Sequence, residues 1–133
     1  GEAIILGIEN CATNGLLAEY LTALRRGPNG FAADHPKIVA AAAKRLDELQ
    51  LVGLIPPPPR QPFARSSISS IMVLGAAMDD DNALARHKSA LDWLKTRGYI
   101  VDDRKKNLVW KGLPIQVVTR RHDAQITLVL TEL

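Results

Sequence analysis

The residues best suited to chemistry in this sequence are three consecutive aspartates followed by an asparagine, at positions 79–82. A second acidic pair, Asp102 and Asp103, comes later, and the two clusters together hold five of the 14 acidic residues. Carboxylates at this density repel one another unless a cation lies between them, and their oxygens are the ligands that Mg²⁺ and Mn²⁺ prefer. The two clusters therefore indicate a candidate site for a divalent cation.

The clusters lie at the two ends of one predicted helix, so they form a single site only if the chain folds back. Alternate side chains of an extended strand point to the same side, which makes Asp79 and Asp81 better ligand candidates than Asp80. Lys88 follows about two helical turns after Asp81, along the same face. A metal ion that activates water, with a lysine adding positive charge, suits phosphodiester hydrolysis. The alternative is that residues 79–82 only cap a helix and form a solvated loop, and on their own they do not decide between the two.

The elements around the first cluster have distinct patterns. An apolar, β-branched run at 71–74 predicts a strand that delivers the aspartates. A helix is expected from 83 to 97, with Asp81 or Asn82 as its N-cap. Both clusters would therefore lie at the borders of regular elements.

One stripe of this helix is apolar and is expected to face the core. It contains Leu84, Leu91 and Leu94, and Lys88 falls on the same stripe, where a lysine needs an acidic partner. Trp93 is also expected in the core rather than on a surface that stacks on bases.

The rest of the chain is assigned from the spacing of its apolar residues. Two further helices are predicted, at 13–26 and 34–53, and the four prolines at 56–59 predict a stiff surface connection. Further strands are expected at 3–8, 107–110, 115–119 and 126–131. The predicted fold class is therefore α+β, with residues 1–133 in a single domain whose mixed β-sheet carries about three helices.

Composition restricts the class of protein. Hydrophobic residues make up 47% of the chain and charged residues 23%, as in an ordinary soluble protein. No apolar run is long enough to span a bilayer, residues 3–8 do not resemble a signal peptide, and the cytoplasm is the expected location. A single cysteine, Cys11, excludes an internal disulfide. The histidines share no metal-ligand spacing, and each is expected to be a surface or cap residue: His35, His87 and His122.

Charge is distributed unevenly along the chain. Residues 1–59 carry five basic and six acidic side chains, whereas residues 60–133 carry twelve basic and eight acidic ones. If the five clustered aspartates bind a metal ion, the second half presents twelve basic against three acidic residues. This balance is typical of an enzyme that attracts a polyanion, although an ordinary solvated surface accounts for it equally well.

A combined motif in residues 66–133 resembles the signature of the RusA-like Holliday junction resolvases of phages and prophages. In that family the pattern is Asp-x-Asp-Asn, a helical lysine, then Gly, two or three apolar residues and Asp-Asp. This chain has Asp79-Asp80-Asp81-Asn82, Lys88, Gly98-Tyr99-Ile100-Val101 and Asp102-Asp103 in that order. Residues 1–59 are a divergent, helical N-terminal part, and the family's N-terminal segment has no recognisable counterpart in residues 1–33.

The resemblance implies a Mg²⁺-dependent, homodimeric endonuclease, with Mn²⁺ as a second possible ion, that resolves branched DNA by paired nicks in recombination and repair in a bacterial host cell. It further implies that Asp79, Asp81 and Asp103 bind the metal ion and that Lys88 is catalytic. The supporting residues, which orient ligands or cap the helix, would be Asp80, Asn82 and Asp102. The expected phosphate contacts are Arg86, Lys105, Lys106, Arg120 and Arg121. The competing hypothesis is a non-catalytic DNA-binding or structural relative of these resolvases.

Overall fold

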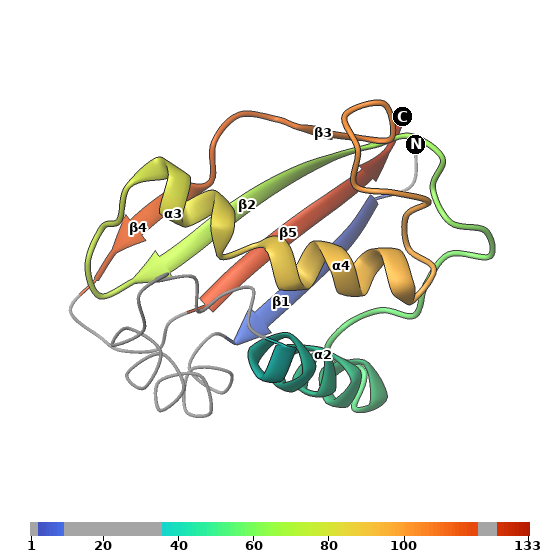
Figure 1. The fold of residues 1–133 in the computed structure, drawn as a ribbon, viewed down its shortest axis with the longest axis horizontal. Coiled ribbons are helices and arrows are strands. Elements are labelled where there is room, and N and C mark those ends of the chain that lie inside the picture. Colours follow the sequence, from blue (N-terminus) through green and yellow to red (C-terminus); the bar gives the residue numbers. More distant parts are fainter. Residues whose placement is uncertain (1–2, 10–35, 120–124) are drawn as a thin grey trace.

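The computed structural model describes residues 3–9, 36–119 and 125–133 (Figure 1). Five strands form one mixed sheet in the order β1-β5-β2-β3, and β4 also pairs with β2. The expected α+β class with a mixed sheet is therefore confirmed. In chain order, the elements are β1 (Ala3–Glu9), α2 (Pro36–Leu51), β2 (Ser66–Leu74), α3 (Asp80–Ala85), α4 (Lys88–Thr96), β3 (Leu108–Trp110), β4 (Ile115–Val118) and β5 (Gln125–Glu132).

The strand β2 is the longest and organises the sheet. It pairs antiparallel with β5 on one side, and on the other it pairs in parallel first with β3 and then with β4. Its alternate residues Ile68 and Met72 are fully buried and pair with Leu130 and Ile126 of β5. Because side chains alternate across a strand, this register places one apolar face of β2 and β5 against the helices.

The helices lie together on one face of the sheet (Figure 1). The core between them and the sheet contains Trp93 and Leu94 of α4, which are 2% and 0% exposed, so the expectation for Trp93 is confirmed. Leu46 and Leu49 of α2 complete this layer. Helical spacing of these apolar positions is what turns one face of each helix inward.

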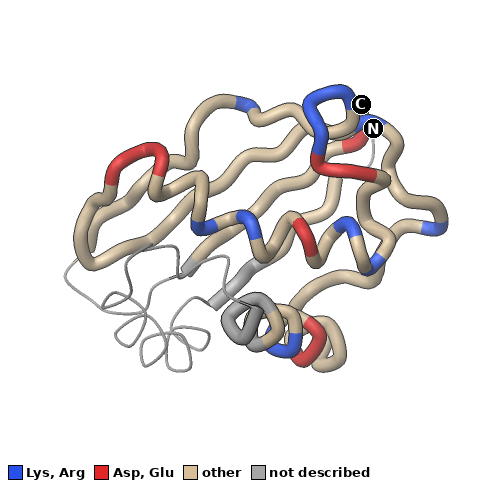
Figure 2. The backbone as a smooth tube through the Cα atoms, viewed as in Figure 1, with Lys and Arg blue, Asp and Glu red and all other residues tan. Residues whose placement is uncertain are grey.

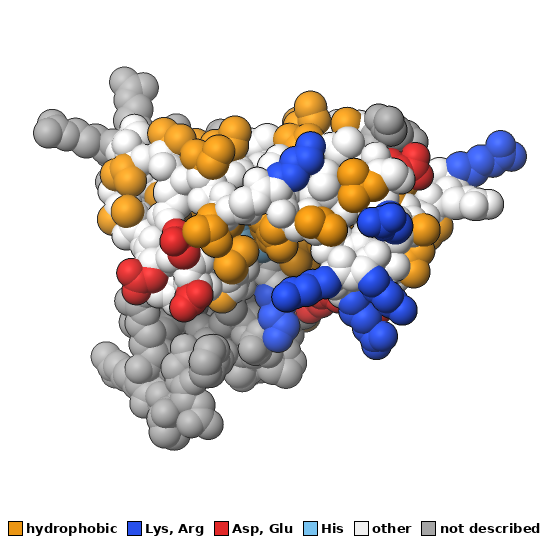
Figure 3. Space-filling model, turned by 90° about the horizontal axis from the view of Figure 1, so that it is seen from above, with side chains coloured by type: hydrophobic (Ala, Val, Ile, Leu, Met, Phe, Trp, Pro, Cys, Tyr) orange, Lys and Arg blue, Asp and Glu red, His pale blue; other side chains and the backbone are white. Residues whose placement is uncertain are grey.

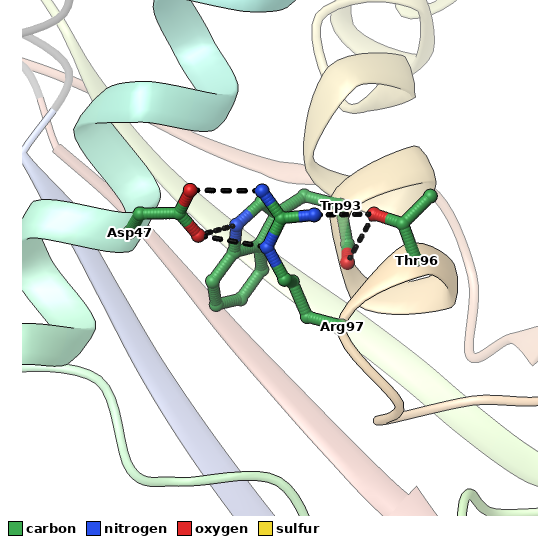
Figure 4. A network of polar contacts seen from close by, with 4 residues as sticks. All are labelled: Asp47, Trp93, Thr96 and Arg97. Carbon is green, nitrogen blue, oxygen red and sulfur yellow. Dashed lines mark hydrogen bonds and ion pairs between the residues drawn. The ribbon is translucent and has the colours of Figure 1, made fainter.

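A polar network joins α2 to α4 at the surface (Figure 4). Asp47 of α2 accepts two parallel hydrogen bonds from the Arg97 guanidinium, each 2.8 Å long, and a third of 2.8 Å from the Trp93 indole nitrogen. The hydrogen bond from Arg97, and then that from Trp93, holds the pKa of the Asp47 carboxyl below its ordinary value of 3.8. This pair therefore fixes the end of α4 against α2.

The opposite face of the sheet carries exposed apolar side chains. Register places Ile71 and Val73 of β2 on the same side as Ile115 and Val117 of β4. Ile71, Ile115 and Val117 are 44%, 60% and 45% exposed. No helix among the residues that the structure describes is long and apolar enough to cross a membrane.

Two helix predictions have an outcome in the described residues. The helix expected at 34–53 is α2, with slightly later start and earlier end. The single helix expected at 83–97 is instead divided into α3 and α4, with a joint at Arg86 and His87. The helix expected at 13–26 lies outside the described residues.

Candidate metal and nucleic-acid site

The first acidic cluster begins α3, just beyond the C-terminal end of β2. Asp79 is the N-cap, and Asp80 and Asp81 form the first helical turn, where the helix dipole favours negative charge. Asp79 to Asn82 are all exposed. The N-cap therefore lies earlier than expected, and the alternation predicted for an extended strand does not apply, because Asp80 and Asp81 are helical.

A side chain from a distant strand fixes the entry to this cluster. The Gln116 amide of β4 donates to the Met78 carbonyl and accepts from the Met78 backbone N–H, each over 2.8 Å. Sequence reasoning missed Gln116, because a single glutamine in a strand gives no local signal of its partner. Its contacts hold Asp79 at one place relative to the edge of the sheet.

Lys88 is the first residue of α4, and its side chain is exposed. The prediction that it shares the inward-facing stripe is wrong, because the joint between the two helices rotates α4 relative to α3. The residue that turns inward is the preceding one, His87, which is 0% exposed. Lys88 thus belongs to the same short segment as Asp79 and Asp81, residues 79–88, which we call the arm.

His87 is the N-cap residue of α4, so the expected cap position is confirmed, but its side chain lies in the core at 0% exposure and the alternative of a surface residue is wrong. Its Nδ1 lies 2.7 Å from the Ala83 carbonyl oxygen, and its Nε2 lies 2.6 Å from the Ser70 hydroxyl of β2. The Trp110 ring packs edge-on against it, with 5.2 Å between ring centroids. Burial lowers the pKa of His87 below its ordinary value of 6.5, more than its backbone hydrogen bonds raise it. The imidazole is therefore kept neutral.

The second acidic cluster lies in the loop after α4. Asp102 pairs with Arg104 (Nε to Oδ2, 3.2 Å), and Asp103 lies 3.9 Å from the Lys95 ammonium. The Asp103 backbone N–H donates to the Asp102 carboxylate over 2.7 Å. A side-chain hydrogen bond with Asp103, followed by this backbone bond and the charges of Arg104 and Lys95, lowers the pKa of Asp102. Arg104 and Lys95 therefore offset the negative charge of this cluster within the same chain.

The structure does not bring the two clusters together within one chain. One follows the C-terminal end of β2, whereas Val101, next to the other, donates to Phe63, which precedes the N-terminal end of β2 (3.1 Å). Figure 2 shows the clusters at opposite ends of the paired helices. Given the rise of a strand and of a helix, their separation is on the order of 20 Å. Among the described residues, no three acidic, histidine or cysteine side chains are close enough to hold a metal ion.

Basic side chains gather near the second cluster. Arg104, Lys105 and Lys106 are consecutive and exposed, and Arg86 is exposed near the first cluster. Figure 3 shows a group of acidic side chains toward one end of one face, whereas most basic side chains lie over the rest of it together with further acidic ones, and apolar side chains lie between the two groups. Of the expected phosphate contacts, Arg120 and Arg121 lie outside the described residues.

No family model matches this chain, and no curated protein is similar enough to be identified as a relative. The chemistry of the site is therefore judged from its own residues. It offers exposed carboxylates and an exposed lysine on one short arm, and a second acidic loop with a basic neighbour at the other end.

Proposed function

We propose that this protein is a Mg²⁺-dependent endonuclease that resolves four-way DNA junctions by paired nicks, as its resemblance to the RusA-like resolvases implies. The observation that carries the proposal is the arm from Asp79 to Lys88, which exposes carboxylates and an ammonium within two short helices. Its proposed setting is DNA recombination and repair in the cytoplasm of a bacterial host cell.

The donor set at the start of α3 fits Mg²⁺ or Mn²⁺. Asp79 and Asp81 offer hard oxygen ligands, and no ion pair engages either of them among the residues that the structure describes. Mg²⁺ is commonly held by one or two carboxylates and retains several waters. A bound ion would supply an activated water and stabilise charge on the phosphate. Lys88 would place a further positive charge beside the phosphate that is cut.

A third metal-binding carboxylate, Asp103, requires a second copy of the chain. Because Asp103 lies on the order of 20 Å from Asp79 and Asp81, it cannot share an ion with them in one protomer. In a two-fold dimer, Asp103 of each protomer would complete the site of the other, and two equivalent sites would face two strands. The exposed apolar face of the sheet, with Ile71 and Ile115, is the kind of surface that homodimers bury.

The first test is cleavage of a mobile four-way junction with Mg²⁺, compared with a linear duplex. The wild type should nick the junction, and Asp79→Asn should lower the rate by about 100-fold or more, because a metal ligand is lost. Junction binding should be retained or improved, because a negative charge near the phosphates is removed. Asp80→Asn is the matched control and should retain most of the rate. Equal rates for Asp79→Asn and wild type would refute the site.

A mixing experiment tests the shared site. Asp79→Asn and Asp103→Asn are each inactive alone, but a mixed dimer contains one site with both wild-type carboxylates. Random mixing should restore about a quarter of the wild-type nicks, because half of the dimers are mixed and each has one intact site. If all three carboxylates acted within one protomer, the mixture would stay inactive.

The separation of the acidic clusters favours one competing function, a DNA-binding relative without catalytic activity. Exposed Arg104, Lys105 and Lys106 would then bind phosphates without any metal ion. This alternative predicts salt-sensitive binding of DNA and no Mg²⁺-dependent nicking of any branched substrate. The cleavage assay therefore separates the two functions directly.

A further inference from the structure

The joint between α3 and α4 sets where Lys88 lies relative to the aspartates. Helix α3 ends at Ala85, and α4 begins at Lys88, so only two residues connect them. The backbone N–H of His87 donates to the Leu84 carbonyl over 3.0 Å, and its carbonyl accepts from Leu91 over 2.9 Å. A small rotation within the joint would swing the start of α4 away from the first turn of α3.

One buried ring ties this joint to the sheet. The Ala83 carbonyl can only accept, so Nδ1 of His87 carries the proton and donates to it over 2.7 Å. Nε2 therefore accepts from the Ser70 hydroxyl over 2.6 Å. Both ring nitrogens are satisfied, and the ring contacts α3, the joint and β2 at once.

The surroundings of the ring restrict its position further. Trp110 of β3 packs against it edge-on at 80°, and Ala83, whose carbonyl accepts from it, is 0% exposed. His87 itself is also fully buried, so water cannot replace its partners without opening the core. The imidazole is buried and hydrogen-bonded through both ring nitrogens, so it holds the two-residue joint in one conformation.

We propose that His87 is a positioning residue that holds Lys88 at a fixed place relative to Asp79 and Asp81, with Ser70 as its anchor in the sheet. The role rests on the proposed nuclease function, because Lys88 and the aspartates act together only there. His87 itself touches no substrate. It acts by holding the two helices in one relative orientation, and small errors in such geometry have large effects on rate.

The activity test separates the reaction step from binding. Ser70→Ala removes the anchor and should lower the nicking rate at saturating enzyme by about tenfold or more, while the Kd for the junction without Mg²⁺ stays within about twofold. Ser70→Thr retains the hydroxyl and should retain the rate. Ile4→Val, in the core at β1, is the control for loss of stability alone and should nick at the wild-type rate. The inference would be overturned if Ser70→Ala nicked the junction at the wild-type rate. It would also be overturned if the nicking rates of these variants simply followed their Tm values.

A structural test does not depend on cleavage. Residual dipolar couplings of the backbone amides in α3 and α4 report the angle between the helices in solution. Ser70→Ala, or His87→Asn if the first variant fails to fold, should change that angle, and Ile4→Val should not. An unchanged angle overturns the inference. If the wild type nicks no junction, the proposed function fails, and the couplings alone decide the role of His87.

Discussion

His87 is a buried titratable residue, and its surroundings disfavour the protonated, charged form of its ring. Because burial lowers its pKa in the folded protein, the unfolded chain binds a proton more readily at mildly acidic pH. The stability that neutral His87 contributes is complete above its ordinary pKa of 6.5 and is lost as the pH falls toward the lowered value. The slope from this one group is at most about 1.4 kcal/mol per pH unit.

We therefore expect Tm to fall between pH 7 and pH 5 more steeply for the wild type than for His87→Asn. The comparison isolates this group, because all other titratable residues are common to both proteins. Asp47, whose pKa is lowered from 3.8, loses its contribution only at more acidic pH and does not overlap with this window. Parallel Tm curves for the two proteins between pH 7 and pH 5 would show that His87 does not titrate on unfolding.

For single residues, a cluster of charge was easier to recognise in the sequence than the burial of one side chain. The acidic run at 79–82 was predicted to start a helix or bind a cation because local charge reveals it. The burial of His87 was not predicted, because its sequence neighbours Arg86 and Lys88 are charged and its buried partner Ser70 is distant in sequence. Tertiary contacts of this kind leave no periodic signal.

An exposed ion pair joins the end of α4 to α2, in addition to their contacts in the core. Arg97 meets Asp47 through two parallel hydrogen bonds of 2.8 Å. Lysine cannot reproduce this planar fork, so Arg97→Lys should lower the free energy of unfolding by about 0.5–1 kcal/mol, a value already discounted for the exposure of both side chains. Chemical denaturation measures this change. Arg45→Lys, at an ion pair within one helix, is the control and should have a smaller effect.

The presence of most strands and helices could be predicted from the sequence, but the break within one predicted helix could not. The β-branched run of β2 and the alternation in β5 identified both strands, because a half-buried sheet requires those residue types. The break between α3 and α4 has no glycine or proline to reveal it. At this break the ring of His87 contacts Ser70 of the sheet, and a tertiary contact of this kind has no signal in helical propensity.

Across the described residues, the order of strands and helices was predicted correctly apart from the division of one helix into α3 and α4, but the distance between the acidic clusters was not predicted. Sequence spacing fixed the clusters at the ends of one helical segment, yet whether that segment folds back or runs along the sheet depends on tertiary packing. The paired helices begin beyond the C-terminal end of β2 and cross the face of the sheet, so the clusters stay apart (Figures 1 and 2). If Asp103 shares a metal ion with Asp79 and Asp81, as in the proposed function, this separation requires a second copy of the chain.

The basic loop at the far end of the molecule should provide much of the attraction for DNA. Lys105 and Lys106 are exposed and follow Asp103 by two and three residues, so in the proposed dimer they would lie beside the phosphates near the partner's aspartates. Each lysine that neutralises a phosphate adds about one to the slope of log Kd against log salt concentration. The double variant Lys105→Ala/Lys106→Ala should therefore reduce this slope by about two, measured by titrating a labelled junction at several salt concentrations.

The matched control is Lys44→Ala, an exposed lysine on α2. It removes positive charge from a different element and should leave the slope unchanged. Because the double variant leaves Lys88 and the aspartates intact, its nicking rate at saturating enzyme should remain close to that of the wild type. An unchanged salt dependence would place the DNA elsewhere. A loss of rate under saturation would instead show that this loop acts in the reaction step and not only in binding.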